Sequence, residues 1–317
     1  MQLLAAPDKF RGTLTAREAA AAIAAGAARA DWTAIELPLA DGGEGTLDVL
    51  GGGNRRTTVT GPLGDPVEAD WRLDEDGTAL IEAALACGLA LAGGPERNDP
   101  LRATSRGVGE LVAAAVAAGA ARIVVAVGGV ASTDGGVGAV GALPPDLPPI
   151  DVACDVEARF LDAADVFAPQ KGATPEQVQA LRERLARLDV PDAPGAGAAG
   201  GLAGGLAAIG ARLLPGFDLV ASRLDFDERL AEADLVVTGE GLVDATSVTG
   251  KVVGRVLARA EADHVEALVL AGEVAAGSPI DAISLVERYG PKRALAEPAE
   301  CLAELVETAL ATRRNGP

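Results

Sequence analysis

The sequence predicts an α/β protein in which a Rossmann-like parallel-sheet domain, built from both ends of the chain, is interrupted by an inserted mixed α/β domain. Short apolar strands alternate with alanine-rich helices at both ends, polar glycine-rich turns follow these strands, and closely spaced β-like runs fill the part between. We expect the discontinuous domain at residues 1–59 and 225–317, the inserted domain at residues 60–224, and the active site in the cleft between them.

The N-terminal part of the chain predicts two βα units. Residues 2–6 form an apolar run typical of a short strand, and Thr15 with Glu18 makes a capping box that starts an alanine-rich helix. Residues 34–39 predict a second strand, followed by a polar, glycine-rich turn at residues 40–45 and a short helix. The repeated unit predicts parallel strands with polar turns at their carboxyl ends.

The middle of the chain predicts a different kind of sheet. Turn signals separate three β-like runs, at residues 57–60, 67–73 and 78–82. An apolar helix at residues 106–118 then leads into a buried strand at residues 123–125. This texture marks the inserted domain.

The turn at residues 128–138 combines glycine, hydroxyl and carboxylate groups. Glycines let backbone N–H groups approach an anion, Ser132 and Thr133 add hydroxyl donors, and the start of a helix supplies partial positive charge. Asp134 would repel a bare phosphate, so we expect it to hold a metal ion or to accept a proton from an attacking hydroxyl. The turn predicts a phosphate site, with a glycine-rich turn that binds no ligand as the alternative.

Further polar groups follow later strands. A brief strand at residues 151–155 ends in a second carboxylate, Asp155, and a strand at residues 234–238 precedes the polar segment 239–244. A last strand is expected at residues 265–271. In open α/β sheets, ligands bind where strands end and helices begin. We therefore expect one set of polar residues to converge on the cleft: Asp8, Lys9, Arg11, Asp41, Glu44, Asp134, Asp155, Lys171, Glu240, Asp244 and Lys251.

Composition and missing motifs exclude several classes of function. The formal net charge of −19 argues against nonspecific binding to nucleic acid or an anionic membrane. We interpret the apolar residues 111–131 as a buried helix and a core strand, because Arg122 and Gly119 interrupt them. Three cysteines and one histidine make no zinc pattern, so we expect reduced thiols in the cytoplasm. Serine-hydrolase, Walker A and protein-kinase motifs are absent.

A dehydrogenase remains the other enzyme class common among α/β chains. Residues 195–205 contain the spacing G-x-G-x-x-G, but prolines rather than a strand precede it. This context argues against a dinucleotide turn. Many acids with glycines and a few lysines instead suit magnesium, phosphate and a polar substrate.

The motifs, taken in order, resemble those of the bacterial glycerate kinases of the single-chain, two-domain type. The clearest are A-P-D-K-F-R-G-T-L-T-A at residues 6–16 and P-L-A-D-G-G-E-G-T at residues 38–46. The other matching segments lie at residues 104–110, 128–136, 154–156, 167–173 and 238–244. Each motif alone is weak evidence, but their common order covers nearly the whole chain.

The resemblance implies transfer of the γ-phosphoryl group of ATP, with Mg²⁺, to a hydroxyl of D-glycerate, with the 2-hydroxyl favoured. It implies a small hydroxy acid as partner and leaves a homodimer open. The catalytic candidates are Asp134, Asp155, Lys171 and Arg11. The metal candidates are Asp41, Asp134 and Asp244. The candidates for binding substrate or nucleotide are Asp8, Lys9, Gly42, Gly43, Glu44, Thr104, Ser105, Gly128, Gly129, Ser132, Thr133, Gly135, Gln170, Gly239, Glu240 and Lys251.

The chain also departs from the family pattern. Lys9 and Arg11 stand where the family has serine and lysine, and Val130 replaces a serine. The N-P-L segment that the family has after Asp155 is absent, and Ala245 replaces a glutamine near Asp244. A kinase for another small hydroxy acid and a nucleotide-binding paralogue without catalysis therefore remain alternatives.

Overall fold

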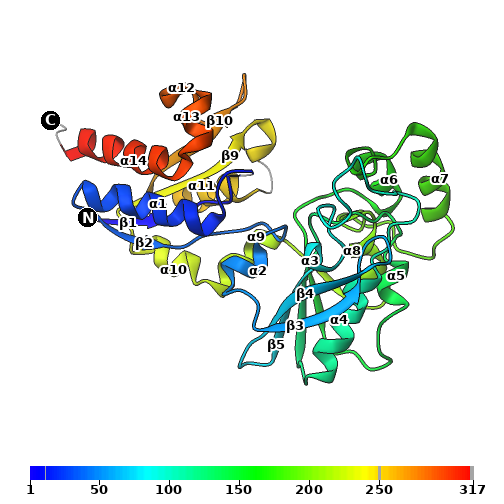
Figure 1. Ribbon diagram of the computed structural model, residues 1–317. Helices are drawn as coiled ribbons and strands as arrows, with labels where there is room; N and C mark the ends of the chain where they lie inside the picture. The colour runs from blue at the N-terminus through cyan, green and yellow to red at the C-terminus, as the bar shows by residue number, and fades with distance from the viewer. Residues whose placement is uncertain (11, 249–250, 315–317) are drawn as a thin grey trace. The chain divides into compact units, whose positions relative to one another are not determined.

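Two sheets with separate hydrophobic cores organise the chain (Figure 1). The computed structural model describes residues 1–10, 12–248 and 251–314. It divides the chain into a first unit, Met1–Asp41 with Phe217–Pro317, and a second unit, Gly42–Gly216. The predicted class, a parallel-sheet domain from both chain ends with a mixed α/β insertion, is confirmed by the two sheets.

The boundaries between the units differ from those expected at residues 59/60 and 224/225. The second unit begins at Gly42 because residues 45–47 bind the end of one of its strands, through Glu82. It ends at Gly216, after its last strand. Turn residues that look like part of the first βα repeat therefore belong to the insertion.

The first unit is an open, doubly wound sheet. Its strands are β1 (Gln2–Ala5), β2 (Thr33–Glu36), β9 (Leu235–Val243), β10 (Glu266–Val274) and β11 (Ile283–Ser284). Its helices are α1 (Ala16–Arg29), α9 (Gly216–Arg223), α10 (Phe226–Ala231), α11 (Val252–Ala262), α12 (Leu285–Tyr289), α13 (Pro291–Ala296) and α14 (Pro298–Arg314), with the 3₁₀ turn η3 (Ala245–Val248). Among the described residues the strand order is β11-β10-β9-β1-β2, and each neighbouring pair is parallel.

Helices cover both faces of this sheet. Helices α1 and α14 lie side by side (Figure 1) and share one core with Leu3 and Leu270. Val253 of α11 packs with Val269 and Ala271 in a separate core. Alternate residues of β10 thus point to opposite faces, as expected for a strand buried on both sides.

Strand β9 is longer than the sequence predicts. We expected the strand to end at residue 238, before the polar segment 239–244, but Gly239 and Glu240 pair with β10 opposite Leu270 and Ala271. Gly239 permits this pairing because a Cβ there would collide with the carbonyl oxygen of Leu270. The expected end of the strand is wrong, and Glu240 lies within the sheet.

The second unit is a mixed sheet with helices. Its strands are β3 (Arg55–Thr60), β4 (Pro66–Leu73), β5 (Thr78–Glu82), β6 (Arg122–Ala126), β7 (Ile150–Ala153) and β8 (Arg212–Leu214). Its helices are α2 (Thr46–Val49), α3 (Ala84–Cys87), α4 (Arg106–Ala117), α5 (Val137–Val140), α6 (Ala163–Phe167), α7 (Pro175–Leu185) and α8 (Leu202–Ala208), with the 3₁₀ turns η1 (Phe160–Asp162) and η2 (Pro169–Lys171). Strands β3 to β5 pair antiparallel, and β5 to β8 pair parallel.

The long apolar run at residues 111–131 divides as expected. It contains the end of α4 and all of β6. Within the described part of the chain, no helix combines the length and the apolar character needed to cross a membrane.

Candidate active site

Three acidic side chains follow neighbouring strands of the first unit. Asp8 comes after β1, Asp41 after β2, and Glu240 lies in β9, which pairs with β1. The amide of Asp8 donates to the carbonyl oxygen of Gly239 (2.9 Å), which places Asp8 beside Glu240. We call Asp8, Asp41 and Glu240 the carboxylate cluster, because they act on one another electrostatically at this edge of the sheet.

Burial shifts the ionisation of the carboxylate cluster. It raises the pKa of Asp8 to about 7, and Lys9 opposes this rise while Asp41 and Glu240 add to it. Burial also raises the pKa of Glu240, whose Oε1 is buried and has no hydrogen-bond partner among the described residues. A buried carboxylate oxygen without a partner is costly unless a cation or a donor joins it. This oxygen is therefore a candidate ligand atom.

Two further predicted residues lie beside the cluster. Lys251, at the start of α11, places its Nζ 3.8 Å from Glu240 Oε2 and 3.9 Å from Asp244 Oδ1. Asp244 also accepts hydrogen bonds from the hydroxyl (2.6 Å) and the amide (2.7 Å) of Thr246, and these bonds lower its pKa. The first unit thus brings together Asp8, Lys9, Asp41, Gly239, Glu240, Asp244 and Lys251.

The metal candidates do not form a complete cage. Asp41 and Asp244 lie in the first unit and Asp134 in the second, and the described residues contain no group of three His, Cys, Asp or Glu side chains that could hold a metal ion. Mg²⁺ usually takes one or two carboxylates together with water and substrate phosphates. The unpartnered Glu240 Oε1 fits that mode. The carboxylate cluster therefore suits a Mg²⁺ ion that arrives with a phosphate compound.

The glycine-rich turn of the second unit is anchored by Asp134. Its carboxylate accepts hydrogen bonds from the amide and the hydroxyl of Ser105 (both 2.9 Å), Gly136 N (3.1 Å) and Gly138 N (3.2 Å). The helix that follows, α5, is a single turn whose first amides are bound to this carboxylate. We expected the partial positive charge at the start of this helix to attract phosphate, but the carboxylate of Asp134 occupies that position.

A buried lysine lies against the same turn. Lys171 is only 4% exposed, and its Nζ donates to the carbonyl oxygen of Ser132 (2.6 Å). Burial lowers the pKa of Lys171 to about 8, against the opposing effects of Cys87 and Asp134. Gly200 has a positive φ of 67° and lies so close that a Cβ would stand 2.9 Å from Nζ. The backbone therefore encloses the ammonium group.

Three residues bonded to Lys171 or adjoining its partner Ser132 carry polar atoms without partners. The hydroxyls of Ser132 and Thr133 are fully buried, and neither finds a hydrogen-bond partner in the described part of the chain. Asn98 donates to the carbonyl oxygens of Ala131 (3.2 Å) and Lys171 (2.9 Å), while its own Oδ1 is buried without a partner. We call Asn98, Ser132, Thr133 and Lys171 the lysine site. Its ammonium and hydroxyl groups suit a small anion.

Sequence reasoning missed two residues that shape the second unit. Glu82, at the end of β5, accepts hydrogen bonds from Gly45 N (3.1 Å) and Leu47 N (2.9 Å) and so holds the end of the predicted turn at residues 40–45. A carboxylate ending an apolar strand was a usable signal. Asn98 has no comparable signal, because its partners are distant in sequence.

The remaining candidates divide into three groups. Gly43 and Glu44 pack against Gly128 and Gly129, so a Cβ on either of the latter would collide with them, and the amide of Gly128 donates to Gly42. The amide of Gly135 donates to Gly200, and the hydroxyl of Thr104 accepts from Arg106 N. Outside these contacts, Asp155 is half-buried and accepts from Gly216 N (3.0 Å), Gln170 is exposed, and Arg11 lies outside the described residues.

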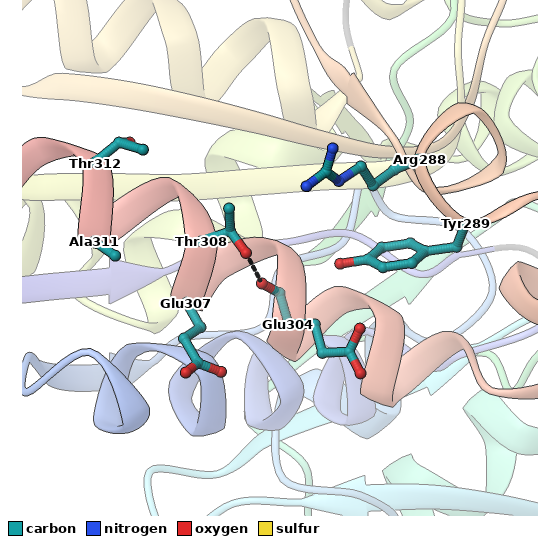
Figure 2. Close-up of a pocket in the computed structure, with 7 residues that line it drawn as sticks. All are labelled: Arg288, Tyr289, Glu304, Glu307, Thr308, Ala311 and Thr312. Atoms are coloured by element: carbon teal, nitrogen blue, oxygen red, sulfur yellow. Dashed lines mark hydrogen bonds between the residues drawn. The ribbon is translucent and has the colours of Figure 1, made fainter.

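A surface recess of about 520 Å³ lies elsewhere in the first unit (Figure 2). Arg288 and Tyr289 of α12 face residues of α14, including Glu304 and Thr308. The Glu304 carboxylate is paired with Arg293 (2.6 Å). None of the predicted site residues lines this recess, and it adds no group to either cluster.

Comparison with known proteins identifies the family. The sequence profile of the glycerate kinase family matches residues 3–147 and 144–312. The chain is 36% identical to glycerate 2-kinase of Escherichia coli K12, over 92% of this chain and 88% of that protein. It is 43% identical to an uncharacterized protein of Mycobacterium bovis, over 100% of this chain and 93% of that one.

A solved structure gives the same result. The crystal structure of "putative glycerate kinase 2" from Salmonella typhimurium LT2 matches 99% of this chain and 98% of its own, with a TM-score of 0.81 and 34% identity. The resemblance drawn from the ordered motifs is confirmed, and the chain is a kinase that belongs to the glycerate kinase family.

Proposed function

We propose that the protein transfers the γ-phosphoryl group of ATP to D-glycerate and forms 2-phosphoglycerate. The observation that supports this most directly is the buried ammonium group of Lys171 beside the two unpartnered hydroxyls of Ser132 and Thr133. In a chain of this family, such a set of donors suits the anionic oxygens of a small acid. The family membership supplies the reaction class.

The lysine site is assigned to the acceptor acid and the carboxylate cluster to the nucleotide with its metal. Lys171 and the two hydroxyls bind the carboxylate of the acceptor, in surroundings where hydrogen bonds are strengthened by the exclusion of water. Glu240 and Asp41 would hold Mg²⁺, with Asp8 beside them. A Mg²⁺ ion held by these carboxylates would supply positive charge against the phosphates.

The proton of the attacking hydroxyl is assigned to Asp155. Asp134 is buried and accepts hydrogen bonds from Ser105, Gly136 and Gly138, whereas Asp155 is half-buried and accepts one from Gly216 N. The hydroxyl oxygen forms a bond to the γ-phosphorus as the bond to the bridging oxygen of ADP breaks, and the carboxylate of Asp155 takes the hydroxyl proton. Phosphoryl transfer of this kind needs positioned groups rather than a covalent enzyme intermediate.

Coupled release of ADP tests the proposal. The purified protein is incubated with ATP, Mg²⁺ and a panel of small hydroxy acids, and the phosphorylated product is identified by NMR. We expect ADP that depends on D-glycerate and a product phosphorylated at the 2-hydroxyl. Folded protein that releases no such ADP eliminates the proposal. Turnover with a different acid would favour the related kinase, which the altered segment after Asp155 supports.

A further inference from the structure

Asn98 holds an acceptor atom in a fixed direction. Its Nδ2 carries two hydrogens, and the carbonyl oxygens of Ala131 and Lys171 accept them. Two carbonyl acceptors on one side of the side chain settle which end of the amide is nitrogen, because an oxygen there would face two other oxygens. Oδ1 therefore points away from both carbonyls, and it is buried with no partner among the described residues.

The polar side-chain atoms of the lysine site differ in what they can bind. Lys171 Nζ donates only, and the hydroxyls of Ser132 and Thr133 can donate to an anion. Asn98 Oδ1 accepts only, so a carboxylate or phosphate oxygen would be repelled there, whereas a hydroxyl would satisfy it. Asn98 bonds to Ala131, which precedes Ser132, and to Lys171, whose Nζ binds Ser132. Donors for an acid group and an acceptor for an alcohol thus belong to one bonded set of residues.

We propose that Asn98 is a specificity residue that recognises the hydroxyl of the acceptor that is not phosphorylated. Resting on the function proposed above, this is the 3-hydroxyl of D-glycerate, which donates to Asn98 Oδ1 while Lys171, Ser132 and Thr133 hold the carboxylate. D-lactate has the same carboxylate and 2-hydroxyl but lacks the 3-hydroxyl. In a buried site, an acid without that hydroxyl leaves Oδ1 unpaired, and such sites discriminate strongly against the analogue.

The test compares two substrates in three proteins. We measure kcat/KM and, by calorimetry without turnover, the Kd of D-glycerate and D-lactate for the wild type, Asn98→Ala and Asn54→Ala. Asn54 is the matched control, because its Nδ2 donates to Leu73 O and its Oδ1 accepts from Leu73 N (both 3.0 Å), so no atom of its amide awaits a ligand. We expect the wild type and Asn54→Ala to prefer D-glycerate by about 100-fold or more, and Asn98→Ala by less than about 10-fold.

A purely structural role for Asn98 gives a different result. If Asn98 only bridges Ala131 and Lys171, or if an internal water satisfies Oδ1, its removal weakens both acids equally and the preference stays unchanged, which overturns the proposal. Equal binding of D-glycerate and D-lactate by the wild type also overturns the proposal. This measurement does not depend on the folding of Asn98→Ala. Preferential binding of D-glycerate without any turnover would sink the proposed reaction and leave the role of Asn98 standing.

Discussion

Asp134 and Glu240 are almost equally buried, at 9% and 8% exposure, yet their surroundings differ completely. In the second unit, Asp134 accepts hydrogen bonds from Ser105, Gly136 and Gly138. In the first unit, Glu240 Oε1 has no partner in the described chain, and burial raises the pKa of this side chain. The oxygens of Asp134 fix a backbone, whereas Glu240 interacts with Ser247 and Lys251 and still keeps one buried oxygen open to a ligand. Burial alone therefore does not distinguish the two roles.

The contrast extends to the charged groups beside these carboxylates. Burial raises the pKa of Asp8 in the first unit to about 7 and lowers that of Lys171 in the second to about 8. Neither group is ionised as readily as it would be in water, which is a cost that proteins tend to retain at functional sites.

The largest effect is expected from Lys171→Met, which removes the ammonium group and keeps the apolar stem. We expect kcat/KM for the acceptor acid to fall about 100- to 1000-fold, because the variant loses a buried donor to an anion. The coupled ADP assay measures this fall, with Lys292→Met, an exposed lysine of α13, as the control that keeps full activity. A decrease in kcat/KM smaller than tenfold would show that Lys171 does not bind the acceptor acid.

The pH profile and the stability of Lys171→Met separate chemistry from folding. In the wild type, kcat/KM should decrease as the pH rises through about 8, where Lys171 loses its proton, and the variant should lack this decrease. Because folding lowers this pKa from 10.5, burying the charge costs stability below about pH 8, and the cost disappears between pH 8 and 10.5. At pH 7 the variant should therefore unfold with a free energy equal to the wild type or about 1–2 kcal/mol higher.

Asp134→Asn should reduce the stability of the fold, whereas Lys171→Met reduces kcat/KM. The amide must turn an N–H group toward at least one donor that the carboxylate now accepts from, so we expect the free energy of unfolding to fall by about 3 kcal/mol. Urea titration measures the change, and Asp146→Asn, at an exposed position, should alter it by less than about 0.5 kcal/mol. If activity disappears while stability is preserved, Asp134 takes part in the chemistry and the contrast with Glu240 fails.

Glu240→Gln should give the smallest effect. In contrast to Asp134→Asn, it should weaken ligand binding and leave the stability of the fold unchanged. Since Oε1 has no partner to lose, unfolding by urea should be unchanged or slightly harder, while the affinity for Mg²⁺ in the presence of ADP falls about tenfold. Calorimetry measures that affinity, and Glu261→Gln, an exposed change on α11, serves as the control. Unchanged Mg²⁺ binding, or a loss of stability as large as that of Asp134→Asn, would contradict the ligand role.

Local signals in the sequence were sufficient to predict much of the fold. The capping box of Thr15 with Glu18 is confirmed at the start of α1, because its two partners are only three residues apart. The ordered polar motifs contain the residues of both clusters except Asn98. They also indicated the family, because each motif can be recognised in sequence without knowing its contacts.

The features that sequence did not predict depend on distant partners. The polar segment from Gly239 suggested that the strand ends at residue 238, but pairing with β10 extends β9 to Val243. The anchoring of Asp134 requires Ser105, 29 residues away, and the orientation of Asn98 requires Lys171, 73 residues away. No local pattern reports such hydrogen bonds. Which polar atoms remain unsatisfied therefore becomes visible only in three dimensions.

The pairing of β1 with β9 determines the order in which the two units can fold during translation. Residues 3–5 leave the ribosome early, but their partners at 235–237 emerge only after the whole second unit has been synthesised. The second unit is continuous in sequence, so it can complete its core during translation, while the first unit waits with an open strand edge. Premature termination before β9 would thus leave a folded insertion attached to an unfinished, aggregation-prone N-terminal segment.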